Sequence, residues 1–238
     1  MMTWRCRGIV AAALAAAACG CRPSPPPAAN IGFHLSSSSD VERLGRVVFV
    51  ELDYEPSHVA QAGQMTSALH LAIQSRHLFH IGVVRRDAPV CRDLPLAKRE
   101  PLTLGELSAL REALRCDAVL LGRLVSFHPH PRMQVGLYLN LLDLRDGKVV
   151  WALEHIWDTA DRSMEARLRW FSRTKLRRGY EPADWRLATM SPSLFAKFVA
   201  EEAADTLMPP PPAPRPQEEA RAPVNTDERG YEKEHDVR

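Results

Sequence analysis

The sequence predicts an α/β fold, an α+β sandwich in which helices pack on a mixed sheet of about five strands. Two observations carry this prediction. Between residues 45 and 160, segments with strand patterning alternate with segments whose apolar residues recur at helical spacing, in the order β-α-β-α-β-β-β. The dipeptide Asp146-Gly147, a strong hairpin signal, joins the last two strands. A hydrophobic content of 45% supports a folded core.

The first half of this domain contains two strands, each followed by a helix. RVVFVELDY (46–54) is apolar on both faces at its start, which is typical of a covered strand. A helix extends from Ser57 to about Arg76, and HLFHIGVVRR (77–86) is the second strand. The second helix begins with Thr103 and Glu106, three residues apart in a capping-box pattern, and ends near Cys116.

The second half is predicted to be an antiparallel meander followed by helices. DAVLLGRLVSF (117–127) is the third strand, and MQVGLYLNLLDL (133–144) and KVVWALEHIWD (148–158) alternate as the hairpin strands. Helical patterns follow at 163–179 and at 191–207, where Ser191 is placed as the N-cap and Pro192 at the first helical position.

The chain divides into five regions by composition. Residues 1–18 are a signal peptide of the lipoprotein type, and residues 19–44 are a Pro/Ser-rich tether that cannot build a core. The α/β domain covers 45–160 and a helical extension covers 161–208. The Pro-rich and charged tail, 209–238, is expected to be disordered.

The N-terminus carries an export signal. Arg5 and Arg7 precede an apolar run from Gly8 to Ala18, which is shorter than the roughly 20 residues that a spanning helix needs. The segment resembles bacterial lipoprotein signal peptides, in which a cysteine after a small-residue box is lipidated. The resemblance implies that Cys19 carries diacylglycerol and an N-acyl chain such as palmitate, with Cys21 as the alternative.

The same resemblance favours an address in the cell envelope. Gly20 stands where an Asp holds some of these lipoproteins at the inner membrane, so the outer membrane, facing the periplasm, is expected. An ordinary signal peptide cut near Ala18 is the alternative, and it would leave a soluble exported protein.

The middle of the chain also resembles a known group. Cys116-Asp117-Ala118, the stretch LLGRL (120–124) and the hairpin LDLRDGKVVW (142–151) are similar to motifs of envelope lipoproteins. This group includes the curli-secretion lipoprotein, the lipoprotein activators of penicillin-binding proteins and the TolB N-terminal domain. The resemblance implies a non-enzymatic adaptor or scaffold that binds an envelope protein. The alternative is a homo-oligomeric subunit of an envelope transport or secretion assembly.

Composition and motifs exclude several other functions. The net charge is +2, and removal of residues 1–18 takes away two arginines, so the mature chain lacks the basic excess that nucleic-acid binding needs. No nucleophile elbow, phosphate-binding glycine loop or zinc motif is present in the sequence, so neither an enzyme nor a cofactor is expected. His128 and His130 lie two residues apart, but the sequence indicates no third ligand, so no metal site is predicted.

Two sets of residues remain as candidate sites. Cys91 and Cys116 flank the second helix; they form either a disulfide or two separate apolar thiols. The segment 161–178 contains seven Lys or Arg residues against two acids. It is either a contact for anionic lipid or an acidic partner, or a solvated face with Trp170 and Phe171 turned inward. The candidate contact residues are Arg167, Trp170, Arg173, Lys175, Arg177 and Arg178.

Overall fold

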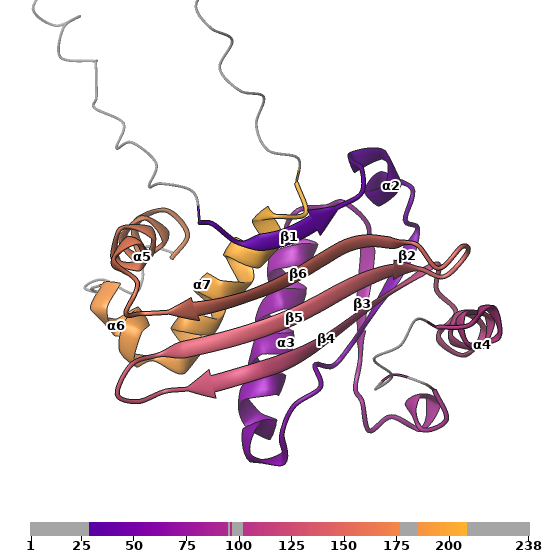
Figure 1. Ribbon diagram of the computed structural model, residues 1–238, viewed down its shortest axis with the longest axis horizontal. Helices are drawn as coiled ribbons and strands as arrows, with labels where there is room; N and C mark the ends of the chain where they lie inside the picture. Colours follow the sequence, from indigo (N-terminus) through magenta and orange to yellow (C-terminus); the bar gives the residue numbers. More distant parts are fainter. Residues whose placement is uncertain (1–28, 95, 97–101, 177–184, 209–238) are drawn as a thin grey trace, which may run out of the picture. The chain divides into compact units, whose positions relative to one another are not determined.

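The computed structural model describes residues 29–94, 96, 102–176 and 185–208. Within them, six strands form one mixed sheet in the order β1-β6-β5-β4-β2-β3 (Figure 1). The strands are β1 (Gly32–Leu35), β2 (Arg46–Val50), β3 (His80–Val84), β4 (Ala118–His128), β5 (Gln134–Asp143) and β6 (Val149–Asp158). The helices are α2 (Ser38–Glu42), α3 (Val59–Gln74), α4 (Leu104–Leu114), α5 (Arg162–Thr174), α6 (Trp185–Met190) and α7 (Pro192–Asp205), with short 3-10 turns at Pro56–His58 and Pro89–Cys91.

The sheet confirms the predicted α/β class and its mixed topology. β2 lies between β3 and β4 and is parallel to both, because a helix returns the chain after β2 and again after β3. β4, β5, β6 and β1 are antiparallel neighbours. Gly147, with φ 76°, closes the β5–β6 hairpin in the left-handed conformation that glycine adopts without strain.

The sheet begins earlier in the chain than the sequence predicts. The range 19–44 was predicted as a tether, but it contains β1 and α2, so the estimate of about five strands is one short. β1 has no amphipathic signal, because three of its four residues are exposed. It forms through backbone pairing with the edge of β6, where Gly32 lies opposite Glu154 and Leu35 opposite Trp151.

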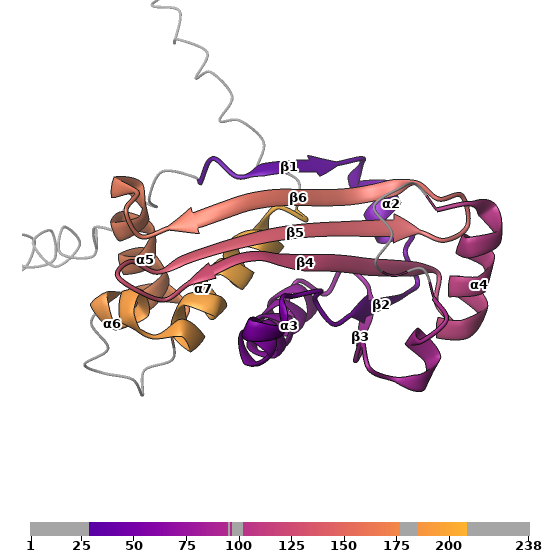
Figure 2. The same ribbon diagram turned by 60° about the horizontal axis from the view of Figure 1, so that its bottom comes forward.

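Two apolar clusters hold the sheet between helices. The larger cluster joins α3, α5 and α7 to the strands, and Figure 2 shows α3 and α7 together on one face of the sheet. Trp151 is fully buried there, and its Nε1 donates to the Oγ1 of Thr206 over 3.0 Å. The smaller cluster packs α4 and the turn at Pro89–Cys91 against β2 and β4. The C-terminal helices therefore belong to the core of the domain.

The helix ends match the predicted capping residues closely. At α4, the Oγ1 of Thr103 accepts from the backbone N–H of Glu106, and the Glu106 carboxylate accepts from the Thr103 N–H over 2.7 Å. Ser191 is the N-cap residue of α7 by position, although its hydroxyl makes no capping bond, and Pro192 begins the helix. None of the described helices combines the length and the apolar character that crossing a bilayer requires.

Candidate interaction site

The open edge of β3 is the main candidate site. The backbone N–H of His80 donates to Gly45, and the carbonyl of Val84 accepts from Glu51 over 2.8 Å. Even-numbered residues of β3 therefore face β2, and the N–H and C=O groups of Ile81 and Val83 point away from the sheet. The Nε2 of His70 lies 3.3 Å from the Ile81 oxygen. Among the described residues, no further hydrogen bond covers this edge.

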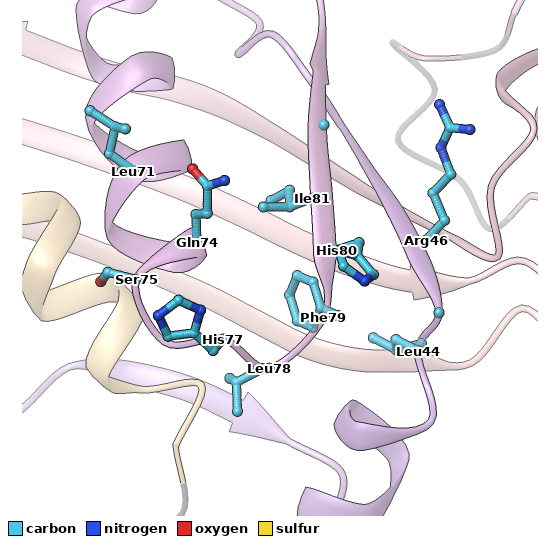
Figure 3. Close-up of a pocket in the computed structure, with 12 residues that line it drawn as sticks. Leu44, Arg46, Leu71, Gln74, Ser75, His77, Leu78, Phe79, His80 and Ile81 are labelled. Atoms are coloured by element: carbon cyan, nitrogen blue, oxygen red, sulfur yellow. The ribbon is translucent and has the colours of Figure 1, made fainter.

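A groove of about 890 Å³ lies beside this edge. It separates the C-terminal end of α3 from the start of β3, and Gln74 of α3 points toward Ile81 of β3 (Figure 3). The turn between the two elements depends on His77, whose φ of 53° reverses the chain directly after the helix. The lining residues are Leu44, Gly45, Arg46, Leu71, Gln74, Ser75, His77, Leu78, Phe79, His80, Ile81 and Gly82.

The lining of the groove is apolar and basic. Leu71 is 63% exposed at its rim, and Leu78 and Ile81 are half-buried along it. Among the described residues that line it, the ionisable ones are Arg46, His77 and His80, and none carries a carboxylate. A groove of this kind fits an extended segment that carries apolar and acidic side chains.

The predicted lipidation sites lie outside the described residues. Cys19 and Cys21 belong to this part of the chain, as do Arg177 and Arg178 from the basic segment. Lipid attachment therefore stays a prediction from the sequence.

The prediction that Arg167 contacts a membrane or partner is wrong. Its side chain is only 5% exposed, and its Nη1 lies 2.8 Å from the Oε2 of Glu202 in α7. Arg167 points inward because it shares one side of α5 with three buried apolar residues: Met164, Leu168 and Phe171. Phe171 is thus turned into the domain, as the alternative interpretation of the segment expected.

The rest of the basic segment divides between the surface and the core. Arg173 is exposed, and Lys175 is exposed but lies 3.1 Å from the Glu201 carboxylate. Trp170 is half-buried. Glu201 and Asp205 also pair with Arg76, which joins the ends of α3 and α7.

A small group of titratable side chains lies under α5. Burial raises the pKa of Glu202, against the opposing effect of the Arg167 guanidinium and the Trp157 indole N–H, which donates to it over 2.8 Å. Burial also lowers the pKa of His155, and the charge of Arg167 lowers it further. These groups connect β6, α5 and α7, and their role is structural.

Of the two alternatives for Cys91 and Cys116, the structure has the separate thiols and not the disulfide. Both residues are free thiols, buried in the smaller apolar cluster. Burial raises the pKa of the Cys116 thiol to about 11 and raises that of Cys91 as well. Both residues pack as small apolar side chains, and neither has the lowered pKa of a reactive cysteine.

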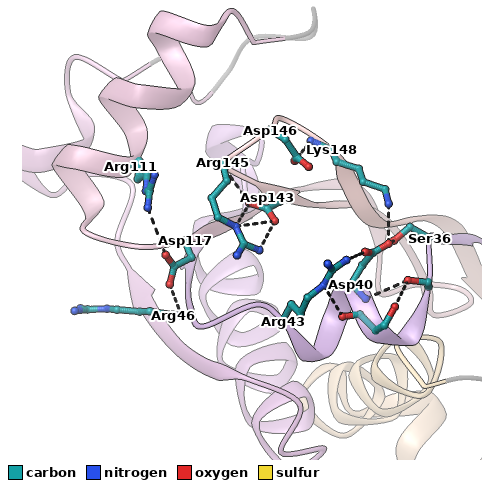
Figure 4. Close-up of polar contacts among 12 residues, drawn as sticks. Ser36, Asp40, Arg43, Arg46, Arg111, Asp117, Asp143, Arg145, Asp146 and Lys148 are labelled. Carbon is teal, nitrogen blue, oxygen red and sulfur yellow. Dashed lines mark hydrogen bonds and ion pairs between the residues drawn. The ribbon is translucent and has the colours of Figure 1, made fainter.

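Charged side chains form a structural network at the end of the sheet where the β5–β6 hairpin turns (Figure 4). The Asp40 carboxylate of α2 accepts from the Nζ of Lys148 over 2.7 Å and from the hydroxyl of Ser36. Several hydrogen-bond donors hold the pKa of Asp40 far below its usual range, and Lys148 has the largest effect among them. Asp143 likewise pairs with Arg145. The network ties α2 to the β5–β6 hairpin.

Within the described residues, no three His, Cys, Asp or Glu side chains gather in a way that would hold a metal ion. His128 lies at the end of β4, and His130 lies in the loop after it. Fold and site together define an α/β domain whose distinctive features are an open strand edge and an apolar, basic groove.

No family model matches the sequence, and no curated protein matches it. Solved structures are similar to part of the chain. PelC from Paraburkholderia phytofirmans, crystallised as a dodecamer, is 13% identical over 58% of this chain and 88% of its own, with a TM-score of 0.40. Lipoprotein GNA1162 from Neisseria meningitidis is 15% identical over 49% of this chain and 83% of its own, with a TM-score of 0.32.

LpoB from E. coli is 15% identical over 58% of this chain and 75% of its own, also with a TM-score of 0.32. One of these structures is named as a lipoprotein, in keeping with the resemblance that the sequence motifs indicate. At these identities and TM-scores it is a resemblance of fold alone.

Proposed function

We propose that the protein is a non-enzymatic envelope lipoprotein whose α/β domain is an adaptor for a partner protein. The observation that carries the proposal is the open edge of β3 with its adjoining groove. Unpaired N–H and C=O groups on an edge strand can pair with an extended segment of another chain, and neighbouring pockets then select its side chains. The basic, apolar lining favours a segment with apolar and acidic residues.

The anchor of the proposed adaptor is the lipid at Cys19, with Cys21 as the alternative, in the outer membrane facing the periplasm. Two or more acyl chains hold a protein at a membrane stably, whereas one chain does not. Labelling with a fatty acid in the native host tests this part. We expect the label to be lost in Cys19→Ser and kept in Cys21→Ser, and the reverse pattern would move the anchor to Cys21.

The adaptor function is tested by changing the edge of β3 without changing its pairing with β2. The N–H of Val83 points away from β2, so Val83→Pro removes an outward donor and leaves the ladder intact. In capture experiments from envelope extracts, we expect Val83→Pro to lose the partner that the unmodified protein retains. Val83→Thr, which keeps the donor, is the matched control, and circular dichroism monitors the fold. Equal capture by both variants would exclude the β3 edge.

A second candidate function is a subunit of an oligomeric transport or secretion assembly. The specific observation is that, within the residues that the structure describes, the sheet ends in β1 on one side and in β3 on the other. Head-to-tail pairing of two different surfaces produces rings or filaments. Size measurement in detergent separates the two candidates, because a large ring indicates the assembly and a monomer indicates the adaptor.

A further inference from the structure

We propose that the α5–α6 end of the domain is a second membrane contact, which lies on anionic lipid headgroups beside the acyl anchor. This inference concerns a surface other than the β3 edge. It depends on the proposed anchor only for the orientation of the domain, and its test needs neither the acyl chains nor the partner protein.

The first argument is the apolar surface of α6. Leu187 is 47% exposed and Met190 is 72% exposed, whereas Ala188 on the inner side is 1% exposed. At about 100° per residue, Arg186, Leu187 and Met190 share the outer side of this helix. The outer side therefore combines two aliphatic side chains with a positive charge, which is the composition of a surface that rests at a lipid interface.

The second argument is the charge around these side chains. Arg162, Arg169 and Arg173 are exposed on α5, with Glu165 as the exposed acid of that helix. Glu165 pairs with Arg169. Arg186 on α6 is exposed as well. Among the described residues of α5, its N-cap and α6, the exposed charged side chains are thus four arginines and the two acids Asp161 and Glu165. The anionic surface of a bilayer attracts such a group of basic side chains.

The third argument is an aromatic side chain between the two helices. The guanidinium of Arg169 lies 4.9 Å from the ring centroid of Trp185, and that of Arg186 lies 5.4 Å from it. A half-buried tryptophan with basic neighbours is suited to the headgroup level, where an apolar ring and its polar edge are both solvated.

The position of the N-terminal segment agrees with this orientation. β1 enters the sheet with Gly32 opposite Glu154, and β6 ends at Asp158, shortly before α5 begins. Figures 1 and 2 both show the start of β1 at the α5–α6 end and α4 at the opposite end. From Cys19 to Ile31 the chain has roughly twelve residues, a maximum reach of about 40 Å. An anchor at Cys19 therefore keeps this end near the membrane.

The test is vesicle binding by the chain from residue 22 to residue 238, which contains neither candidate lipidation site. Every buried core residue lies between Val41 and Leu207, so this chain keeps both apolar clusters. We expect binding to vesicles that contain phosphatidylglycerol and none to vesicles of phosphatidylcholine alone. Replacing Arg169, Arg173 and Arg186 together by Gln should lower the partition coefficient about a hundredfold, since each basic residue contributes about fivefold.

A matched control changes three exposed arginines away from this end, Arg85, Arg92 and Arg115, to Gln, and binding should be unchanged. The pair Leu187→Ser with Met190→Ser should weaken the binding that persists at high salt, which reports apolar insertion. Equal loss in both triple variants would reduce the effect to general charge and overturn the proposal. Failure to bind both kinds of vesicle would also overturn the proposal, and it would favour an acidic protein as the partner of this surface. Val83→Pro should bind vesicles normally, so failure of the adaptor function would be seen separately.

Discussion

Gly122 shows how a single residue of the chain can be fixed by packing. It lies in β4, within the stretch LLGRL that resembles a motif of envelope lipoproteins. A Cβ at this position would lie 2.5 Å from the Cδ2 of Leu139, 2.7 Å from the Cδ2 of Leu52 and 2.9 Å from the Tyr138 oxygen. The last contact is with backbone, which cannot move as a side chain can. Glycine is therefore required here by the closeness of β5 and the segment after β2.

We predict that Gly122→Ala destabilises the domain by about 1–3 kcal/mol, the usual cost of overpacking a core. Urea unfolding measured by circular dichroism checks this value. Gly82→Ala in β3 is the matched control, because a Cβ there meets nothing within 4 Å. A control as unstable as Gly122→Ala would show that glycine in a strand, rather than the close approach, sets the cost.

At the scale of elements, α5 has two sides with opposite roles. The outer side carries Arg169 and Arg173, whereas Arg167 crosses to Glu202 in α7 and lies near Asp161 at the start of α5, 3.6 Å away. The buried ion pair between Arg167 and Glu202 therefore connects α5 with α7. Removing one partner of such a pair leaves the other charge buried without compensation.

We predict that Arg167→Ala destabilises the domain by about 3–5 kcal/mol. Arg173→Ala on the exposed side should change stability by no more than about 0.5 kcal/mol. Adding Glu202→Gln to Arg167→Met should recover much of the loss, because no unpaired charge then remains. Thermal unfolding of these variants and of the unmodified protein measures the differences. Similar losses of stability in Arg167→Ala and Arg173→Ala would contradict the buried ion pair.

Several elements could be predicted because their signals are local. The capping residues of α4, the alternation in β5 and β6 and the Asp146-Gly147 turn all depend on residues close in sequence. The inward side of α5 also had a local signal, since Arg167 lies three residues after Met164 and four before Phe171. β1 has no such signal: it depends on pairing with β6, more than a hundred residues later.

At the scale of the whole molecule, the candidate site depends on strand order. The segment HLFHIGVVRR predicts a strand, but its sequence cannot show that β3 lies at the edge of the sheet. β2 lies between β3 and β4, and this order alone leaves the backbone groups of Ile81 and Val83 without a strand partner. The groove also needs the end of α3 beside the start of β3. Both features arise from tertiary packing. The sequence motifs could therefore indicate a binding protein, but they could not locate its binding surface.

The stability of the whole domain should fall in mildly acidic solution because of His155. Burial and the charge of Arg167 lower the pKa of its ring, which lies edge-on to Trp157 at 4.7 Å. In the unfolded chain the ring has its ordinary pKa of about 6.5, so as the pH falls below this value the unfolded state takes up the proton first. The stabilising contribution of neutral His155 is thus present above pH 6.5 and is lost as the pH falls toward the lowered pKa.

We predict that the free energy of unfolding, from urea titrations about one pH unit above and below 6.5, decreases less in His155→Gln than in the unmodified protein. The difference between the two proteins isolates His155, because other titrating groups, Glu202 among them, are present in both. His34→Gln, a change of an exposed histidine in β1, is the control and should follow the unmodified protein. An identical decrease of the free energy of unfolding in all three proteins would mean that the ring of His155 is protonated equally in the folded and unfolded chains. Its position under α5 would then contribute nothing to the acid sensitivity of the domain.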